Sequence, residues 1–278
     1  MFATIGLSQE IALLAIGVLA GVAGGLLGVG GGIVMIPAMA LLFGDPWGRD
    51  SFHAYNLASI TTAIVLSIPA AIRHSREKAV IYRLLPGIVP LALLGVVGGV
   101  LLAGVLTGEY THLLKRIFGA FLEFVVLVSV FQEWRSSKGE PHLCSSCPMP
   151  TRRVLIGLIV GLPAGIIAGL LGVGGGIWAV PAQSLLLGVR IRQAIATSTL
   201  MIIPVALATA IGLSVDLARL GNDPPLHHVA WWLALWLAPG ALVGGWCGAG
   251  LTHRLPVRWL RYIFQALLAV TGVKLICA

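Results

Sequence analysis

Long stretches without a charged residue constrain this chain more than any other feature of its sequence. A helix needs about 20 residues to cross the hydrocarbon layer of a bilayer. Segments of about that length or longer are residues 11–44, 54–72, 84–108, 154–189, 193–215 and 229–252. Two weaker segments, residues 117–132 and 262–278, contain Glu123 and Lys274. We therefore expect an all-α, multi-pass protein of the bacterial inner membrane, with the lipid bilayer as its surroundings.

The composition excludes several functional classes. Charged residues make up 10% of the chain and apolar ones 58%, whereas a soluble domain is about 25% charged. The net charge of +8 lies on residues between the apolar segments, so we expect no nucleic-acid partner. The apolar segments contain no HExxH, no GxSxG and no pair of aspartates, which argues against an enzyme. The glycine-rich motif does not fit a dinucleotide fingerprint, because Ile33 replaces the third glycine. We expect no cofactor.

A duplicated motif divides the chain in two. The sequence GVAGGLLGVGGGIVMIP of residues 21–37 returns as GIIAGLLGVGGGIWAVP in residues 165–181. Weaker matches continue through the rest of both halves, for example Gly98-Gly99 with Gly244-Gly245. We predict two transmembrane repeats of about four segments each, residues 1–131 and 152–278. A polar linker, residues 132–151, joins them.

Each repeat begins with a segment that is too long for one crossing. Residues 11–44 as a single helix would extend about 50 Å, so the segment must tilt, break or turn back. Consecutive glycines favour a break, because each lowers helix stability by about 1 kcal/mol relative to alanine. If the segment turns back, 13 of the 18 Lys and Arg residues fall on one side of the membrane. The positive-inside rule then predicts inverted repeats, with both chain termini outside the cytoplasm and the linker inside.

The two glycine breaks are the candidate binding site. A helix that begins at a break offers unpaired N–H groups and a positive dipole end to an anion. Hydroxyl and amide side chains of the neighbouring segments would complete a polar site. The alternative is that the small residues only allow helices to pack closely, with Ser and Thr bonded to their own backbone. The predicted substrate-binding residues are Gly28, Gly30, Gly31, Gly32, Asn56, Ser59, Thr62, Gly172, Gly174, Gly175, Gly176, Gln183, Thr197, Ser198 and Thr199.

The duplicated motif resembles a known family. The sequence GLLGVGGGI followed by a proline, present twice in a chain of this length, is similar to the sulfite exporter TauE/SafE family of membrane transporters. The resemblance implies duplicated helical repeats and the transport of small sulfur-containing or organic anions, such as sulfite or sulfonates. A small anionic solute is therefore the expected partner, moved by alternating access, and a homo-oligomer is left open. A membrane-embedded sensor or assembly protein without transport activity is the alternative.

Two further groups of residues are weaker candidates. Glu123 lies near the middle of its apolar segment, where an ionisable group is costly unless it finds a partner or serves a pathway. It is therefore a candidate for proton coupling, against the alternative that it reaches an interface. In the linker, His142, Cys144 and Cys147 offer three soft ligands, whereas a structural zinc site usually needs four. We expect a reduced, solvated loop there, and no bound metal.

Overall fold

The computed structural model describes residues 7–44, 51–105, 150–219 and 226–256, with scattered residues between 116 and 130 and between 259 and 273. The secondary-structure elements of these residues are helices, and no strand occurs among them. Six of these helices are long and apolar enough to cross a membrane. The prediction of an all-α, multi-pass membrane protein is confirmed. Most of the linker lies outside the described residues, so the boundaries of the repeats stay predictions.

The helices match the expected apolar segments closely. In chain order they are α1 (Leu7–Leu27), α2 (Gly32–Phe43), α3 (Ser51–Arg76), the short η3 (Tyr82–Leu84), α4 (Leu85–Val105), α6 (Pro150–Ile156), η5 (Gly157–Gly161), α7 (Leu162–Leu171), α8 (Gly176–Leu186), α9 (Ile191–Arg219) and α10 (Leu226–Arg254). The element η5 is a π-helical turn that joins α6 and α7 into one span.

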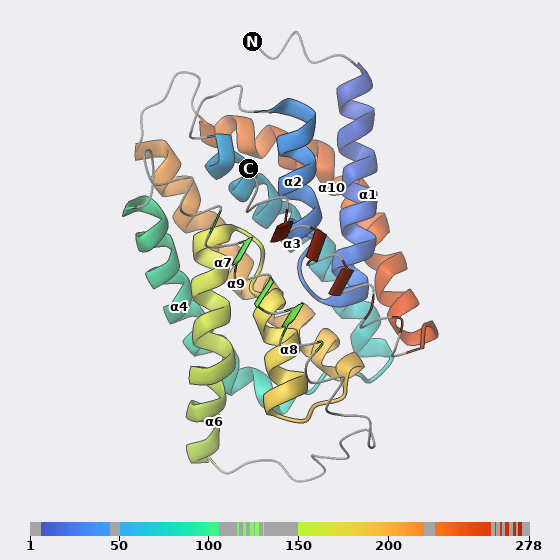
Figure 1. The fold of residues 1–278 in the computed structure, drawn as a ribbon, viewed down its shortest axis with the longest axis vertical. Helices are drawn as coiled ribbons and strands as arrows, with labels where there is room; N and C mark the ends of the chain where they lie inside the picture. The colour runs from blue at the N-terminus through green and yellow to red at the C-terminus, as the bar shows by residue number, and fades with distance from the viewer. Residues whose placement is uncertain are drawn as a thin grey trace.

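Each long first segment breaks at its glycines and turns back. In Figure 1, α1 descends from the N-terminal end to the centre of the molecule, and α2 returns towards that end. The α6–α7 span rises from the opposite end, and α8 returns towards it. We call these pairs the α1–α2 and α7–α8 hairpins. Their opposite directions agree with the expected inversion, which remains a prediction for the complete repeats.

The helices pack across the two halves of the sequence through small residues. On α1, a Cβ atom added to Gly21 would lie 2.6 Å from the carbonyl oxygen of Ala241 in α10. On α7, one added to Gly169 would lie 2.6 Å from the carbonyl oxygen of Val96 in α4. Such close approach of backbones is typical of transmembrane helix interfaces, where van der Waals packing replaces the hydrophobic effect. The first helix of each half is thus held by the third crossing of the other half.

A proline leaves a backbone carbonyl free for a hydrogen bond that holds α8 against the α6–α7 span. Pro163 has no N–H group, so the carbonyl of Ile159 loses the donor that a helix would supply four residues later. The indole N–H of Trp178, in α8, donates to that carbonyl at 2.9 Å. This bond ties α8 to the π-helical turn and satisfies a backbone group that lipid could not.

Candidate functional site

The tips of the two hairpins touch each other in the interior of the molecule. A Cβ atom on Gly30 would lie 3.1 Å from the carbonyl oxygen of Val173, and one on Gly176 would lie 2.7 Å from the Cα atom of Val29. Val29 and Val173, the middle residues of the two tips, are both buried. The structure therefore brings together the two glycine motifs, which are 144 positions apart in the sequence.

The glycines give the tips a backbone that other residues rarely adopt. The φ angles of Gly28, Gly30 and Gly31 are 69°, 87° and 77°, and those of Gly172, Gly174 and Gly175 are 64°, 83° and 71°. This left-handed conformation costs a side-chain-bearing residue about 1–2 kcal/mol. Helices α2 and α8 begin directly afterwards, with Gly31 and Gly175 as N-caps that supply no side-chain hydrogen bond. The first N–H groups of both helices thus lack a partner within their own helix.

The first glycine of each tip packs against the second long helix of the other half. A Cβ atom on Gly28 would lie 2.7 Å from the carbonyl oxygen of Ile195 in α9. One on Gly172 would lie 2.7 Å from the carbonyl oxygen of Asn56 in α3. Ser59, one turn further along α3, donates its hydroxyl to the Gly172 carbonyl at 2.7 Å. The predicted residues Asn56 and Ser59 of α3 therefore do lie beside the second break.

Most of the predicted hydroxyl groups already have partners. Thr62 donates to the carbonyl of Ala58 at 2.8 Å, and Thr199 donates to that of Ile195 at 2.8 Å. These are the bonds to the helix's own backbone that the packing alternative expects. Thr197 accepts a hydrogen bond from the backbone N–H of Ile81 at 3.0 Å. A hydroxyl has one proton to donate, so Thr62 and Thr199 cannot donate to an anion while these bonds persist.

Two amide side chains remain with unsatisfied groups. Asn56 is fully buried, and neither its carbonyl oxygen nor its amide nitrogen has a hydrogen-bond partner. Gln183 of α8 is also fully buried. Its nitrogen donates to the Ser198 hydroxyl at 2.9 Å, while its oxygen has no partner. Because an unsatisfied buried polar group costs about 1–3 kcal/mol, these side chains are the strongest candidates for polar contacts with a solute.

The cap glycines serve the packing of the hairpins directly. A Cβ atom on Gly31 would lie 2.9 Å from the carbonyl oxygen of Ala20, within the same hairpin. One on Gly175 would lie 2.5 Å from the carbonyl oxygen of Ala164. Side chains at Gly31 and Gly175 would therefore push each hairpin apart, whatever they did to a bound solute. Loss of transport in such variants would not separate binding from folding.

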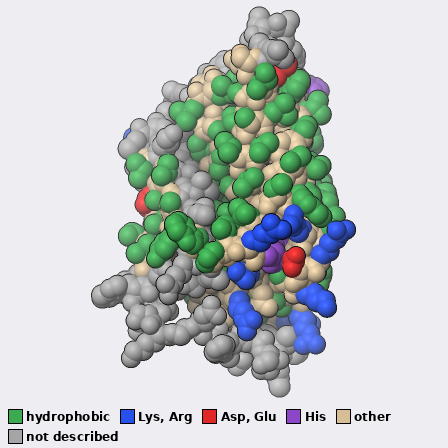
Figure 2. Space-filling view, turned by 90° about the vertical axis from the view of Figure 1, so that its right-hand side faces the viewer, with side chains coloured by type: hydrophobic (Ala, Val, Ile, Leu, Met, Phe, Trp, Pro, Cys, Tyr) green, Lys and Arg blue, Asp and Glu red, His purple; other side chains and the backbone are tan. Residues whose placement is uncertain are grey.

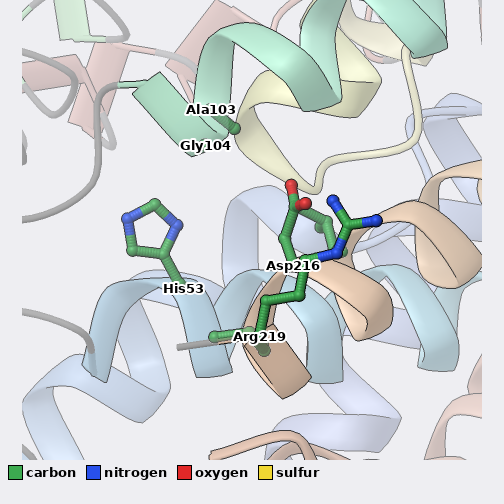
Figure 3. Close-up of a pocket in the computed structure, with 7 residues that line it drawn as sticks. His53, Ala103, Gly104, Asp216 and Arg219 are labelled. Atoms are coloured by element: carbon green, nitrogen blue, oxygen red, sulfur yellow. The ribbon is translucent and has the colours of Figure 1, made fainter. Parts of the chain in front are cut away.

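A cavity of about 190 Å³ lies at the amino-terminal end of α3. Figure 3 shows His53 of α3 on one side of it, Asp216 and Arg219 of α9 on the other, and Gly104 at the end of α4. His53 precedes Asn56 by one helical turn, so the two residues share a face of α3. This cavity was not predicted from the sequence. The available signal was the pair of charged residues Asp216 and Arg219 directly after an apolar segment.

The remaining candidates are only partly described. Glu123 lies against the last apolar segment, residues 262–278, where a Cβ atom on Gly272 would meet its carboxylate. The Oε1 atom of Glu123 has no hydrogen-bond partner. His142, Cys144 and Cys147 lie outside the described residues. Among the residues that the structure describes, no group of three potential metal ligands occurs.

Comparison with known proteins identifies the family. The model of the family described as sulfite exporter TauE/SafE matches residues 13–275. The chain belongs to the sulfite exporter TauE/SafE family. The resemblance expected from the duplicated glycine motif is thereby confirmed. It is a family of membrane transporters and not of enzymes.

Similar proteins are named as probable membrane transporters. The probable membrane transporter protein YunE of Bacillus subtilis is 24% identical over 296 residues, covering 96% of this chain and 97% of YunE. The probable membrane transporter protein MamO of Magnetospirillum gryphiswaldense is 26% identical over 285 residues, covering 92% of this chain. The chain spans less than half the length of MamO, of which 43% is covered. No solved structure matches the chain significantly.

Proposed function

We propose that this TauE/SafE protein transports small anions, sulfite or sulfonates before others, through a site between the tips of its two hairpins. The observation that carries the proposal is the unsatisfied amide of Asn56, whose backbone packs against Gly172 at the tip of the second hairpin. A polar group buried without a partner is a lasting cost unless a ligand satisfies it during function.

An anion at this position would be bound by partial charges alone. The N-terminal ends of α2 and α8 each carry roughly half a positive elementary charge. Asn56 would add an amide N–H donor. The oxygen of Gln183 would accept a hydrogen bond, which suits a partly protonated oxyanion or an amino or hydroxyl group on a sulfonate. A site without Lys or Arg binds an anion weakly enough to release it again, as a transport cycle requires.

Alternating access would follow from the two hairpins. The cavity bordered by His53, Asp216 and Arg219 lies one helical turn from Asn56, and we assign it to the route from that end. The route from the other end would open when the tips separate, because their glycine contacts close the centre. Rocking of matched halves around a fixed site is the usual mechanism of transporters with inverted repeats.

Flux of radiolabelled anions into proteoliposomes tests this function. The panel consists of sulfite, thiosulfate, methanesulfonate and a carboxylate of similar size. We expect saturable exchange of at least one sulfur oxyanion, competed by the others, and none in liposomes without protein. A membrane-embedded sensor or assembly protein would instead bind a partner and show no exchange of any anion in the panel.

A further inference from the structure

A pair of histidines lies at the carboxyl end of α1, just before the first glycine break. His74, near the end of α3, is completely buried, whereas His253, near the end of α10, is partly exposed. The Nδ1 atom of His74 lies 3.0 Å from the Nε2 atom of His253. The Nε2 atom of His74 lies 3.2 Å from the carbonyl oxygen of Gly25 in α1. The pair thus connects the aqueous edge of the protein to the helix that ends at the first glycine break.

The carbonyl of Gly25 is one of the last four of α1, which have no donor inside their own helix. Side chains of two other helices cap this end. The hydroxyl of Thr252, beside His253 on α10, lies 2.9 Å from the Leu26 carbonyl oxygen and 3.3 Å from that of Gly25. His74 supplies the other contact. The end of α1 at the tip of its hairpin is therefore held by α3 and α10.

Hydrogen-bond chemistry fixes where the protons lie. A carbonyl oxygen only accepts, so His74 must carry a proton on Nε2. When His74 is neutral its Nδ1 atom is an acceptor, so His253 donates from Nε2. The Nδ1 atom of His253 is then free to take a proton without breaking either bond. A further proton on Nδ1 of His74 would place two N–H groups face to face and separate the pair.

The charged residues around the pair make protonation of His253 at Nδ1 more favourable when an anion is bound. Arg73 on α3 and Arg192 on α9 act on the pair as positive charges, and Glu77 after α3 is the opposing negative one. Arg76 and Arg254 lie at the ends of α3 and α10, whereas α1 carries only Glu10, in its first turn. Figure 2 shows most of the Lys and Arg side chains of one face gathered at its lower end, below a cover of hydrophobic side chains. A bound anion would offset this excess of positive charge.

From this geometry we infer that His253 and His74 form the binding site of a coupling proton. The proton enters at the partly exposed ring of His253, and its charge strengthens the hydrogen bond from His253 to His74, since charge-assisted hydrogen bonds are roughly twice as strong as neutral ones. The polarised His74 ring then donates more strongly to the Gly25 carbonyl. Gly25 precedes the first break by about 5 Å of helix, so proton and anion favour each other's binding. Such coupling is reciprocal. This inference rests on the proposed anion transport for its role, but not for the protonation itself.

The test uses purified protein in proteoliposomes with radiolabelled methanesulfonate, which stays an anion throughout the pH range. With one proton per anion, a gradient of one pH unit drives about tenfold accumulation in the wild type. We expect His253→Gln and His74→Gln to abolish this accumulation while exchange without a gradient continues. His228→Gln, at the opposite end of α10, is the matched control and should behave as the wild type.

A measurement without substrate separates this inference from the proposed function. Hydrogen exchange of residues 25–34 is compared between wild type and variants at the same pH, so that the intrinsic pH dependence of exchange cancels. On acidification below about pH 6, the wild type and His228→Gln should become better protected than His253→Gln. This result without any anion flux would support the proton site and refute the transport proposal. The proton site is overturned if His253→Gln keeps both full gradient-driven accumulation and wild-type protection, or if the wild type shows neither effect.

Discussion

Replacing Asn56 with leucine tests the anion site against the close-packing alternative. Both polar atoms of the Asn56 side chain are buried without a partner. Each such atom costs about 1–3 kcal/mol, and leucine has a similar volume without polar atoms. After a misfit of up to about 1.5 kcal/mol for the changed shape, Asn56→Leu should stabilise the empty protein by about 0.5–6 kcal/mol. The same variant should lose anion transport.

Two measurements on the same preparation decide the matter. Thermal unfolding in detergent should show a higher midpoint for Asn56→Leu than for the wild type. Adding methanesulfonate at about 100 times its dissociation constant should stabilise the wild type by about 2.7 kcal/mol and leave the variant unchanged. Flux in proteoliposomes should fall to the level of empty liposomes.

Ser67 offers a matched control on the same helix. Its hydroxyl is also fully buried without a hydrogen-bond partner, but it lies about three turns along α3 from Asn56. Ser67→Ala should stabilise the protein by about 1 kcal/mol and keep full transport. An Asn56→Leu protein that is less stable than the wild type would show that Asn56 has a partner in the empty state. One that transports normally would refute the site.

Three further predictions concern other parts of the chain. Gly174 and Gly175 both have positive φ, but a Cβ atom on Gly174 would have its nearest neighbour at 3.4 Å and one on Gly175 at 2.5 Å. Gly174→Ala should therefore lower the free energy of unfolding by about 1–2 kcal/mol. Gly175→Ala should lower it clearly more, which thermal unfolding measures. The linker should be cytoplasmic, so an impermeant thiol reagent should not label Cys144 in intact cells once the exposed Cys247 and Cys277 are replaced. Ready labelling would show that the linker lies outside and that the predicted topology is wrong. If Glu123 relays protons, Glu123→Gln should keep anion binding and lose flux driven by a pH gradient, and undiminished flux would remove it from the mechanism.

The fold was predictable because single helices carry their own signals. Uncharged length located α3, α4, α9 and α10 within a few residues of their observed ends, since a bilayer demands a minimum apolar length. The breaks were predictable from the glycines, whose φ angles there are positive as expected. That the tips meet each other was foreseen only through the duplication, because a matched pair of breaks implies a common centre.

The composition of the site was harder to predict, because it depends on which polar groups find partners. The sequence placed Thr62, Thr199 and Asn56 in one group of candidates, but a hydroxyl on a helix can satisfy itself with the carbonyl four residues earlier. An asparagine amide has too many donors and acceptors for one such bond. Only the structure separates the two threonines, which are satisfied, from Asn56, which is not. His74 and His253 escaped notice because 179 positions separate them.

Different kinds of side chain hydrogen-bond to the two hairpins, and this difference suits the hairpins to different roles. The second hairpin is held by groups that do not titrate near neutral pH, the Trp178 indole on the Ile159 carbonyl and the Ser59 hydroxyl on the Gly172 carbonyl. The end of α1 is held instead by His74, whose ring can change its charge. A proton can therefore alter the hold on the α1–α2 hairpin and leave the other hairpin fixed. If the same groups held both hairpins, a proton would affect them equally. Because His74 contacts only the end of α1, the inferred proton acts on the α1–α2 hairpin.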